Sequence, residues 1–358
     1  MKLYKSILLL SLLASNYLIA ATAQPLSQFL DRRYNQVTQI KTHNSTSTTQ
    51  KSLLWFIPNL VADQHKCLEQ QLIDGIRVFK IPVHPVNQAN VIIPWVTHTL
   101  QDREIEQFVA QGIAYIPSLL RPLFSGAFQR FVNDALQNNL WKIDFTNLPV
   151  QTMLTTLKTF LDSHPNEIIT LFLNVFDLKQ MHQELQNVFH FTGIDSYMVD
   201  QAIDQEWPTI GQLIAANKRL IVFADERINA PGFNYGNDFI YSNDYNYTSV
   251  DALNADAGAG ALTNQAWQRK VAHEQNPTDP KNPDNTLFGL NHFVTPGLAG
   301  TPATAQIANS YDSLMGHVNR CAATLTLNGK KIYPTFLEVK FYDLNFEDQL
   351  KVAARLNG

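Results

Sequence analysis

Cysteine and charged residues are scarce in this chain of 358 residues. Only two cysteines occur, Cys67 and Cys321, and they fit no zinc-binding spacing. Charged residues make up 16% of the sequence, the formal net charge is −4, and no run of Lys and Arg is present, so we expect no nucleic-acid partner. The apolar run near the start is broken by Ser15 and Asn16 and is too short for a membrane span, and no other segment has about 18 uninterrupted apolar residues.

The first 23 residues have the pattern of an export leader. Two early lysines give a basic start, residues 7–13 are largely apolar, and Ala21-Thr22-Ala23 is an A-x-A cleavage sequence. The sequence therefore predicts a signal peptide at 1–23, one mature domain at 24–358, and a secreted or periplasmic protein. An uncleaved anchor is the alternative. In an exported protein the two cysteines suggest one disulfide, and two separate buried thiols are the alternative.

Short apolar, β-branched runs alternate with helical segments along the mature chain. Continuous apolar runs such as 168–173 suit parallel strands buried on both faces, and their alternation with helices indicates βα units. The sequence thus predicts an α/β fold with a parallel sheet. Residues 101–148 are interpreted as an apolar lid or lipid-contacting rim, or else as ordinary packing, and 226–285 as a long loop region. The candidate strands are 37–42, 76–82, 91–97, 167–174, 219–224, 238–241, 286–292 and 335–341.

Two histidines stand where predicted strands stop, His43 after 37–42 and His98 after 91–97. In a parallel α/β barrel the carboxyl ends of the strands form the catalytic rim. Two histidines at one rim can take a proton from one oxygen and give a proton to another. We therefore expect His43 and His98 to lie within roughly 10 Å of each other, with room for one phosphate between them. A structural role for each histidine is the alternative.

Several blocks of the sequence, taken in order, resemble one known family. They begin with Thr42-His43-Asn44-Ser45, continue with Gln71-Leu72-x-Asp74-Gly75-Ile76-Arg77, and reach a histidine that ends the next β-run. This order is similar to the phosphatidylinositol-specific phospholipase C X-domain-like family, of which the chain looks like a divergent member. Blocks at 164–171, 207–211, 218–225, 290–293 and 334–343 resemble its later strands, so the resemblance covers roughly residues 37 to 356.

The resemblance implies a TIM-like (β/α)8 barrel and a phosphodiesterase that uses no redox cofactor. In the family, a substrate hydroxyl attacks the phosphodiester and the lipid leaves. By the resemblance, His43 is the base, His98 is the acid, and Asn44 binds a phosphate or hydroxyl oxygen. His84 resembles the Val-His ending of this strand in fungal and plant members. It is either a third site histidine or a loop histidine, whereas His292 is expected to be structural.

The sequence departs from the family where acidic residues hold calcium or orient a histidine. After residues 75–79 the family places acid-x-Arg or acid-x-acid, and this chain has Lys80-Ile81-Pro82. Asn174 stands where calcium-dependent members place Glu, and Lys340 stands where members often place Asp. Because calcium needs several oxygen ligands, usually charged ones, we expect no metal and no other cofactor. Lys80, Asn174 and Lys340 then become candidate substrate ligands.

The two lysines would give the site its positive charge if they point inward. They would also lower the pKa of nearby histidines, which favours a neutral base. The alternative for each lysine is an ion pair with Glu338 or another carboxylate.

Two functions follow from these residues. The first is a secreted, metal-independent phosphodiesterase of the phospholipase C type, acting on a phosphoinositide or related phosphodiester by His/His acid–base catalysis. It would have a phospholipid as substrate and a membrane surface as peripheral contact. The second is a non-catalytic lipid- or glycan-binding protein on the same barrel, because a fold does not fix a function. The retained histidines favour the enzyme, and the missing carboxylates favour the binding protein.

Overall fold

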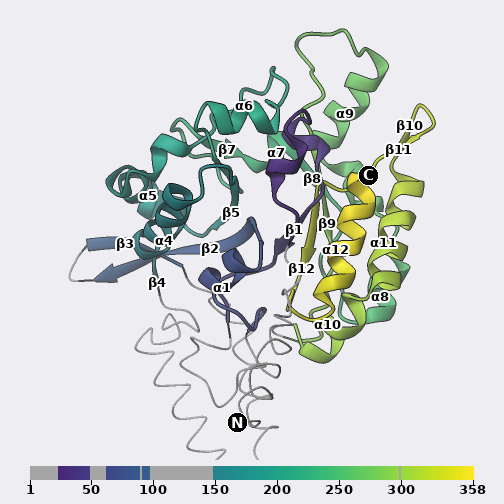
Figure 1. Cartoon of the computed structure of the whole chain (residues 1–358), viewed down its shortest axis with the longest axis horizontal. Helices are drawn as coiled ribbons and strands as arrows, with labels where there is room; N and C mark the ends of the chain where they lie inside the picture. The colour runs from purple at the N-terminus through teal and green to yellow at the C-terminus, as the bar shows by residue number, and fades with distance from the viewer. Residues whose placement is uncertain (1–22, 49–61, 89–90, 97–147, 298–299) are drawn as a thin grey trace, which may run out of the picture.

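Eight parallel strands curl into a TIM-like half-barrel (Figure 1). The computed structural model describes residues 23–48, 62–88, 91–96, 148–297 and 300–358. In the described part the two outermost strands do not pair with each other, so the barrel is open on one side. The predicted α/β class and parallel TIM-like barrel are confirmed. In spatial order the strands are β7 (Phe233–Tyr235), β6 (Leu220–Ala224), β5 (Ile169–Val175), β2 (Val78–Gln88), β1 (Gln39–Thr42), β12 (Phe336–Val339), β9 (Leu287–Asn291) and β8 (Ile240–Ser242).

The predicted strand at 91–97 is not one of these eight. It forms β3 (Val91–Val96), which pairs antiparallel with the outer part of β2, from Val83 opposite Val96 to Gln88 opposite Val91. Only two residues separate β2 from β3. A parallel pairing needs a crossover connection of about a dozen residues, so this short connection allows an antiparallel hairpin and excludes a parallel pair. A short strand, β4 (Leu148–Pro149), extends this side arm antiparallel to β3.

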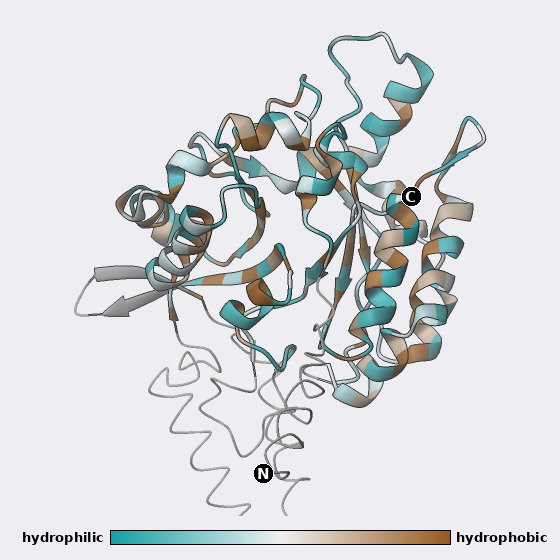
Figure 2. Ribbon diagram, in the orientation of Figure 1, coloured by the Kyte–Doolittle hydropathy of each residue, from teal (hydrophilic) through white to brown (hydrophobic). Residues whose placement is uncertain are grey.

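Helices cover the outside of the curled sheet (Figure 1). Helix packing on the sheet follows an amphipathic pattern, and Figure 2 shows hydrophobic and hydrophilic residues alternating along the last two long helices. The α-helices are α1 (Leu68–Ile73), α4 (Val150–Ser163), α5 (Leu178–Thr192), α6 (Ile210–Ala215), α7 (Gly236–Phe239), α8 (Val250–Ala255), α9 (Gln265–Gln275), α10 (Pro302–Ala308), α11 (Tyr311–Thr324) and α12 (Phe346–Asn357). In the described part of the chain, 3₁₀ helices lie at Leu26–Phe29, Tyr34–Gln36, Ile194–Tyr197 and Ala259–Thr263, and a hairpin joins β10 (Thr326–Leu327) to β11 (Lys330–Lys331).

Side chains alternate across the sheet between an apolar shell and the barrel interior. On β12, Leu337 and Val339 belong to the clusters beneath the helices, whereas Phe336 belongs to the cluster that fills the interior. Phe223 and Trp207 join Phe336 in that cluster, with 6.0 Å between the ring centroids of Trp207 and Phe223. Glu338, two residues after Phe336 and on the same face of β12, places a buried charge near the carboxyl end of that strand.

The region 226–285 is more structured than the predicted loop. It contains β7, α7, β8, α8 and α9. The predicted strand at 238–241 overlaps β8, whereas β7, α7, α8 and α9 were not predicted. A strand of three residues and helices of four and six residues are too short to give a clear periodic pattern. No helix in the described part of the chain has the length and apolar character needed to cross a membrane.

No disulfide joins the two cysteines. Cys67 lies immediately before α1, and Cys321 is buried on α11. Of the two alternatives left by the sequence, the structure has the one without a disulfide. The predicted leader lies outside the described residues except for Ala23, as does almost all of the predicted lid at 101–148.

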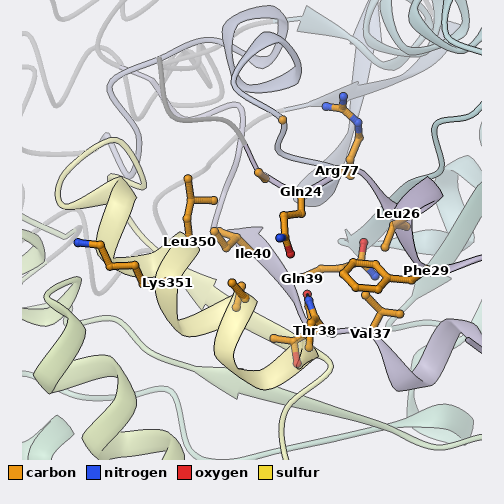
Figure 3. Close-up of a pocket in the computed structure, with 15 residues that line it drawn as sticks. Gln24, Leu26, Phe29, Val37, Thr38, Gln39, Ile40, Arg77, Leu350 and Lys351 are labelled. Atoms are coloured by element: carbon orange, nitrogen blue, oxygen red, sulfur yellow. Dashed lines mark hydrogen bonds between the residues drawn. The ribbon is translucent and has the colours of Figure 1, made fainter. Parts of the chain in front are cut away.

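A cavity of about 270 Å³ opens at the amino end of β1, on the opposite side from His43 (Figure 3). Phe29 and Leu26 line one side, and Leu350 and Lys351 of α12 line the other. Its wall is mainly apolar, and Arg77 at its edge is already paired with Glu167 at 2.8 Å. Lys351 is paired with Asp348 at 3.0 Å, so both charged side chains that line the cavity already have carboxylate partners.

Candidate functional site

His43 follows β1 directly and is held by the neighbouring strand β12. Its backbone N–H donates to Val339 O at 2.9 Å, and its Nδ1 lies 2.5 Å from Glu338 Oε1. Because an ionised carboxylate only accepts hydrogen bonds, Nδ1 carries the proton and Nε2 presents a lone pair. The ring also packs against Phe293, with 4.1 Å between the ring centroids. His43 thus has the tautomer and the fixed orientation that a general base requires.

The surroundings of His43 keep the imidazole neutral. Burial lowers the pKa of His43 to about 3, and the ammonium groups of Lys80 and Lys340 act in the same direction, whereas Glu338 opposes the shift. The sequence predicted this effect of the two lysines. The imidazole is therefore ready to accept a proton at any pH near neutrality.

Glu338 is the centre of a buried charge cluster and is only 2% exposed. Its second oxygen lies 2.8 Å from Lys41 Nζ, and Lys80 Nζ lies 3.7 Å from the first oxygen. Burial raises the pKa of Glu338, but Lys41, Lys80 and the bond to His43 outweigh it and hold that pKa well below its usual range. Burial also lowers the pKa of Lys41 to about 8, against the attraction of Glu338, so Lys41 remains largely cationic at neutral pH.

Asp63 is the second buried carboxylate and is 1% exposed. It accepts hydrogen bonds from Lys340 Nζ at 2.8 Å, Asn44 Nδ2 at 2.7 Å and the backbone N–H of Gly300 at 3.1 Å. A Cβ at Gly300 would lie 2.6 Å from Lys340 Cδ, so glycine allows this close approach. Asp63 Oδ2 is also 4.0 Å from Nε2 of His43, and a carboxylate therefore faces the free side of the base.

The structure thus brings four of the predicted residues together: His43, Asn44, Lys80 and Lys340. Lys340 forms an ion pair with Asp63 rather than with Glu338, and it also donates to Thr295 Oγ1 at 2.9 Å. Lys80 is the most open of the cluster's ammonium groups, with 26% of its side chain exposed.

The sequence-based conclusion that no carboxylate orients the histidine was wrong, because Glu338 does so. Glu338 and Lys41 were detectable, since each lies two residues from a predicted site residue and therefore on the same face of its strand. Asp63 gave no signal, because it lies in a connection whose path the sequence does not predict.

Two other predicted ligands lie beside different partners at the β2, β5 and β6 end of the rim. The ring of His84 stacks on Phe176, with 4.1 Å between centroids and 7° between planes. Asn174 donates to the carboxylate of Asp225, which also accepts from the backbone N–H of Val175 at 2.7 Å. Burial raises the pKa of Asp225, so this carboxyl is an additional polar group that the sequence analysis did not single out.

His98 lies outside the described residues, so its expected approach to His43 stays a prediction. The described segment before His98 ends at Val96, which pairs with Val83. Val83 in turn pairs with Val175 at the carboxyl end of β5. The antiparallel strand β3 therefore returns to the level of the rim, although by a different route from the parallel strand that the sequence suggested.

His292 has the structural setting that was predicted for it. It is fully buried, its Nε2 bonds to Ala308 O at 2.8 Å, and its Nδ1 lies 2.8 Å from Nδ1 of His317. Burial lowers the pKa of His292 to about 3. His317, Asp256 and Cys321 are close enough to hold a metal ion, but hydrogen bonds already join them, with 2.8 Å between His317 Nε2 and Asp256 Oδ2.

Comparison with known proteins points to one family. The family model described as PI-PLC X 1 matches residues 137–266, a span that does not include His43 or Glu338. A PI-PLC X domain-containing protein of Arthroderma benhamiae is 37% identical over 92 residues, which cover 24% of this chain and 29% of that protein. A PI-PLC X domain-containing protein of Arabidopsis thaliana is 22% identical over 316 residues, covering 86% of this chain and 58% of that protein.

A solved structure with a similar fold is the phosphatidylinositol-specific phospholipase C from Listeria monocytogenes. Its TM-score is 0.52 at 16% identity, and the alignment covers 92% of this chain and 98% of that one. At this identity the likeness shows the fold alone. The matched part of the chain covers only 29% of the Arthroderma benhamiae protein and 58% of the Arabidopsis thaliana protein. These matches therefore do not transfer the activities of those proteins to this chain.

Proposed function

Because this chain belongs to the PI-PLC X domain family, we propose that it is a phosphodiesterase of the phospholipase C type. The proposed substrate is an inositol phospholipid or a related phosphodiester. The observation that carries the proposal is the neutral His43, held by Glu338 at 2.5 Å beside the partly exposed ammonium of Lys80. A base, a carboxylate that fixes its tautomer and a cation for the phosphate are the groups that attack by a substrate hydroxyl requires.

The proposed first step is proton removal by His43. Nε2 accepts the proton of a substrate hydroxyl while the hydroxyl oxygen attacks phosphorus. The imidazolium that forms is stabilised by Glu338 at Nδ1, as the carboxylate of a catalytic triad stabilises its histidine. Lys80 lies where it can neutralise charge that develops on the phosphate oxygens.

The proposed second step is departure of the lipid alkoxide, which needs a proton. His98 is our candidate for this acid, since a protonated histidine can give its proton to the leaving oxygen. The products would then be a cyclic phosphodiester and a neutral lipid alcohol, and the phosphodiester charge would be unchanged.

We further propose that this chemistry needs no metal ion. Glu338 and Asp63 are the buried carboxylates of the His43 cluster, and lysine ammonium groups are bound to both at 2.8 Å. A divalent cation would have to displace these ammonium groups. Export through the leader at 1–23 and contact of residues 101–148 with a membrane surface also belong to this proposal.

The rival function is a non-catalytic lipid- or glycan-binding protein. One observation favours it: a pKa of about 3 makes His43 a weak base, since less driving force remains for proton transfer. Substrate binding would have to bring the hydroxyl and phosphate close enough to stabilise the imidazolium.

Kinetics of the purified full chain distinguish the two functions. Turnover of phosphatidylinositol in mixed micelles would be compared for the wild type, His43→Gln and His190→Gln. His190 is an exposed residue of α5 and serves as the matched control. We expect His43→Gln to lose about 100- to 10,000-fold in rate and the control to lose nothing. Equal turnover by all three proteins, or none by the wild type, would contradict the proposed function.

A further inference from the structure

Among the described residues, five charged side chains meet around His43. Three are ammonium groups, those of Lys41, Lys80 and Lys340, and two are the carboxylates of Glu338 and Asp63. With His43 neutral, the described cluster has three positive and two negative charges, a net charge of +1. A ligand with one negative charge neutralises this cluster, whereas a ligand with two negative charges leaves an excess of one.

The position of Asp63 is fixed by hydrogen bonds of its own backbone. Its backbone N–H donates to Ser47 O at 3.0 Å, and its carbonyl accepts from the backbone N–H of Phe341 at 2.7 Å. Its side chain receives Lys340 and Asn44, two residues that the sequence offered as phosphate ligands. The carboxylate thus occupies an anion-binding position and uses the charge of Lys340.

We infer that Asp63 determines which charge state of a phosphate ester the site accepts. By neutralising Lys340, it leaves the net charge of +1 that suits a phosphodiester monoanion, and it disfavours a phosphomonoester, which is close to a dianion at pH 7.5. The inference rests on the proposed function, because it assumes that phosphate binds beside His43 and Lys80. It assigns to Asp63 a specificity role.

The size of the effect follows from Coulomb's law. A dianion carries one more negative charge than a monoanion. Removal of the negative charge of Asp63 therefore strengthens dianion binding, relative to monoanion binding, by one additional charge–charge interaction. At roughly 6 Å and an effective dielectric constant of about 20, that interaction corresponds to about 100-fold in affinity. Screening by water at the open rim reduces it, and we expect a change of at least about tenfold in the affinity ratio.

Calorimetry with two soluble probes tests the inference without any turnover. The probes are glycerophosphoinositol, a monoanionic diester, and inositol 1-phosphate, a monoester, both at pH 7.5. The proteins are the wild type, Asp63→Asn, Lys340→Met and the double variant, with Asp162→Asn on α4 as a charge control remote from the site. Asparagine keeps the shape of Asp63, and circular dichroism checks that each variant is folded.

We expect the wild type to prefer the diester and Asp63→Asn to shift the affinity ratio at least tenfold toward the monoester. Lys340→Met should shift it the other way, and the double variant, which again has a net charge of +1, should return close to the wild-type ratio. An unchanged ratio in Asp63→Asn, with both probes bound, would overturn the inference and leave the proposed function standing. If neither probe binds to any folded protein, the proposed function itself is overturned together with the inference.

Discussion

Replacement of Glu338 by Gln tests whether the buried charge cluster holds the site together. Glutamine keeps the size of the side chain and an oxygen that can accept from His43 Nδ1. It removes the charge that Lys41 faces at 2.8 Å, and the Lys41 side chain is only 8% exposed. Loss of one partner from a buried ion pair costs about 3–5 kcal/mol, because the remaining charge is uncompensated. We therefore expect the free energy of unfolding at pH 7 to fall by about that amount.

The pH dependence of this loss has a definite sign. The pKa of Glu338 is depressed in the folded protein, so its contribution is present above the unfolded pKa of about 4.3 and is lost as the pH falls through the folded pKa. The difference between the wild type and Glu338→Gln should be constant from pH 7 to about 5 and should narrow only below about pH 4.

Urea unfolding of three variants at several pH values measures this difference. Glu347→Gln, at an exposed position of α12, is the matched control and should stay within about 0.5 kcal/mol of the wild type. The double variant Lys41→Met/Glu338→Gln should regain much of the loss, since no unpaired charge is left. A loss below about 1 kcal/mol for Glu338→Gln alone, or a double variant less stable than Glu338→Gln, would refute the reasoning.

Three further predictions concern other parts of the account. Lys340→Ala should lower the free energy of unfolding by about 3–5 kcal/mol in urea titrations, because it leaves Asp63 buried and unpaired; a change below 1 kcal/mol would mean that their 2.8 Å contact contributes little. Turnover of phosphatidylinositol should survive a chelator, and loss of turnover that calcium restores would refute metal independence. Mass spectrometry of the exported protein should find a chain that starts near Gln24, and an intact segment from Met1 to Ala23 would disprove the leader.

The parallel barrel was predictable because its strands carry a strong signal. Runs such as 168–173 are apolar on both faces, and one face packs under helices while the other fills the barrel. The error at β3 had a different origin. Its apolar run resembles a barrel strand, and only the two-residue gap after β2 excludes a parallel connection. Local composition identifies a strand, but chain length between strands decides how it pairs.

The site was predictable as far as strand alternation extends. His43 was found from its place at a strand end, and Lys340 from its departure from the residue that the family often has there. Strand alternation could also have located Lys41 and Glu338 on the inward face. Asp63 differs because it reaches the site from the connection between β1 and α1. Its position depends on backbone hydrogen bonds to Ser47 and to Phe341. Phe341 is distant in sequence and has a positive φ of 46°. No local pattern encodes such contacts.

The product formed from phosphatidylinositol tests the central claim most directly. The purified full chain would be incubated with phosphatidylinositol vesicles in the presence of a chelator, and the phosphorus-containing products would be followed by ³¹P NMR. Attack by a substrate hydroxyl, with His43 as the base, predicts that a cyclic inositol phosphodiester appears first and at the same rate as the lipid alcohol. If phosphatidylinositol stays intact, or if the phosphate remains on the lipid product, the account of this site as a phospholipase C-type centre is contradicted.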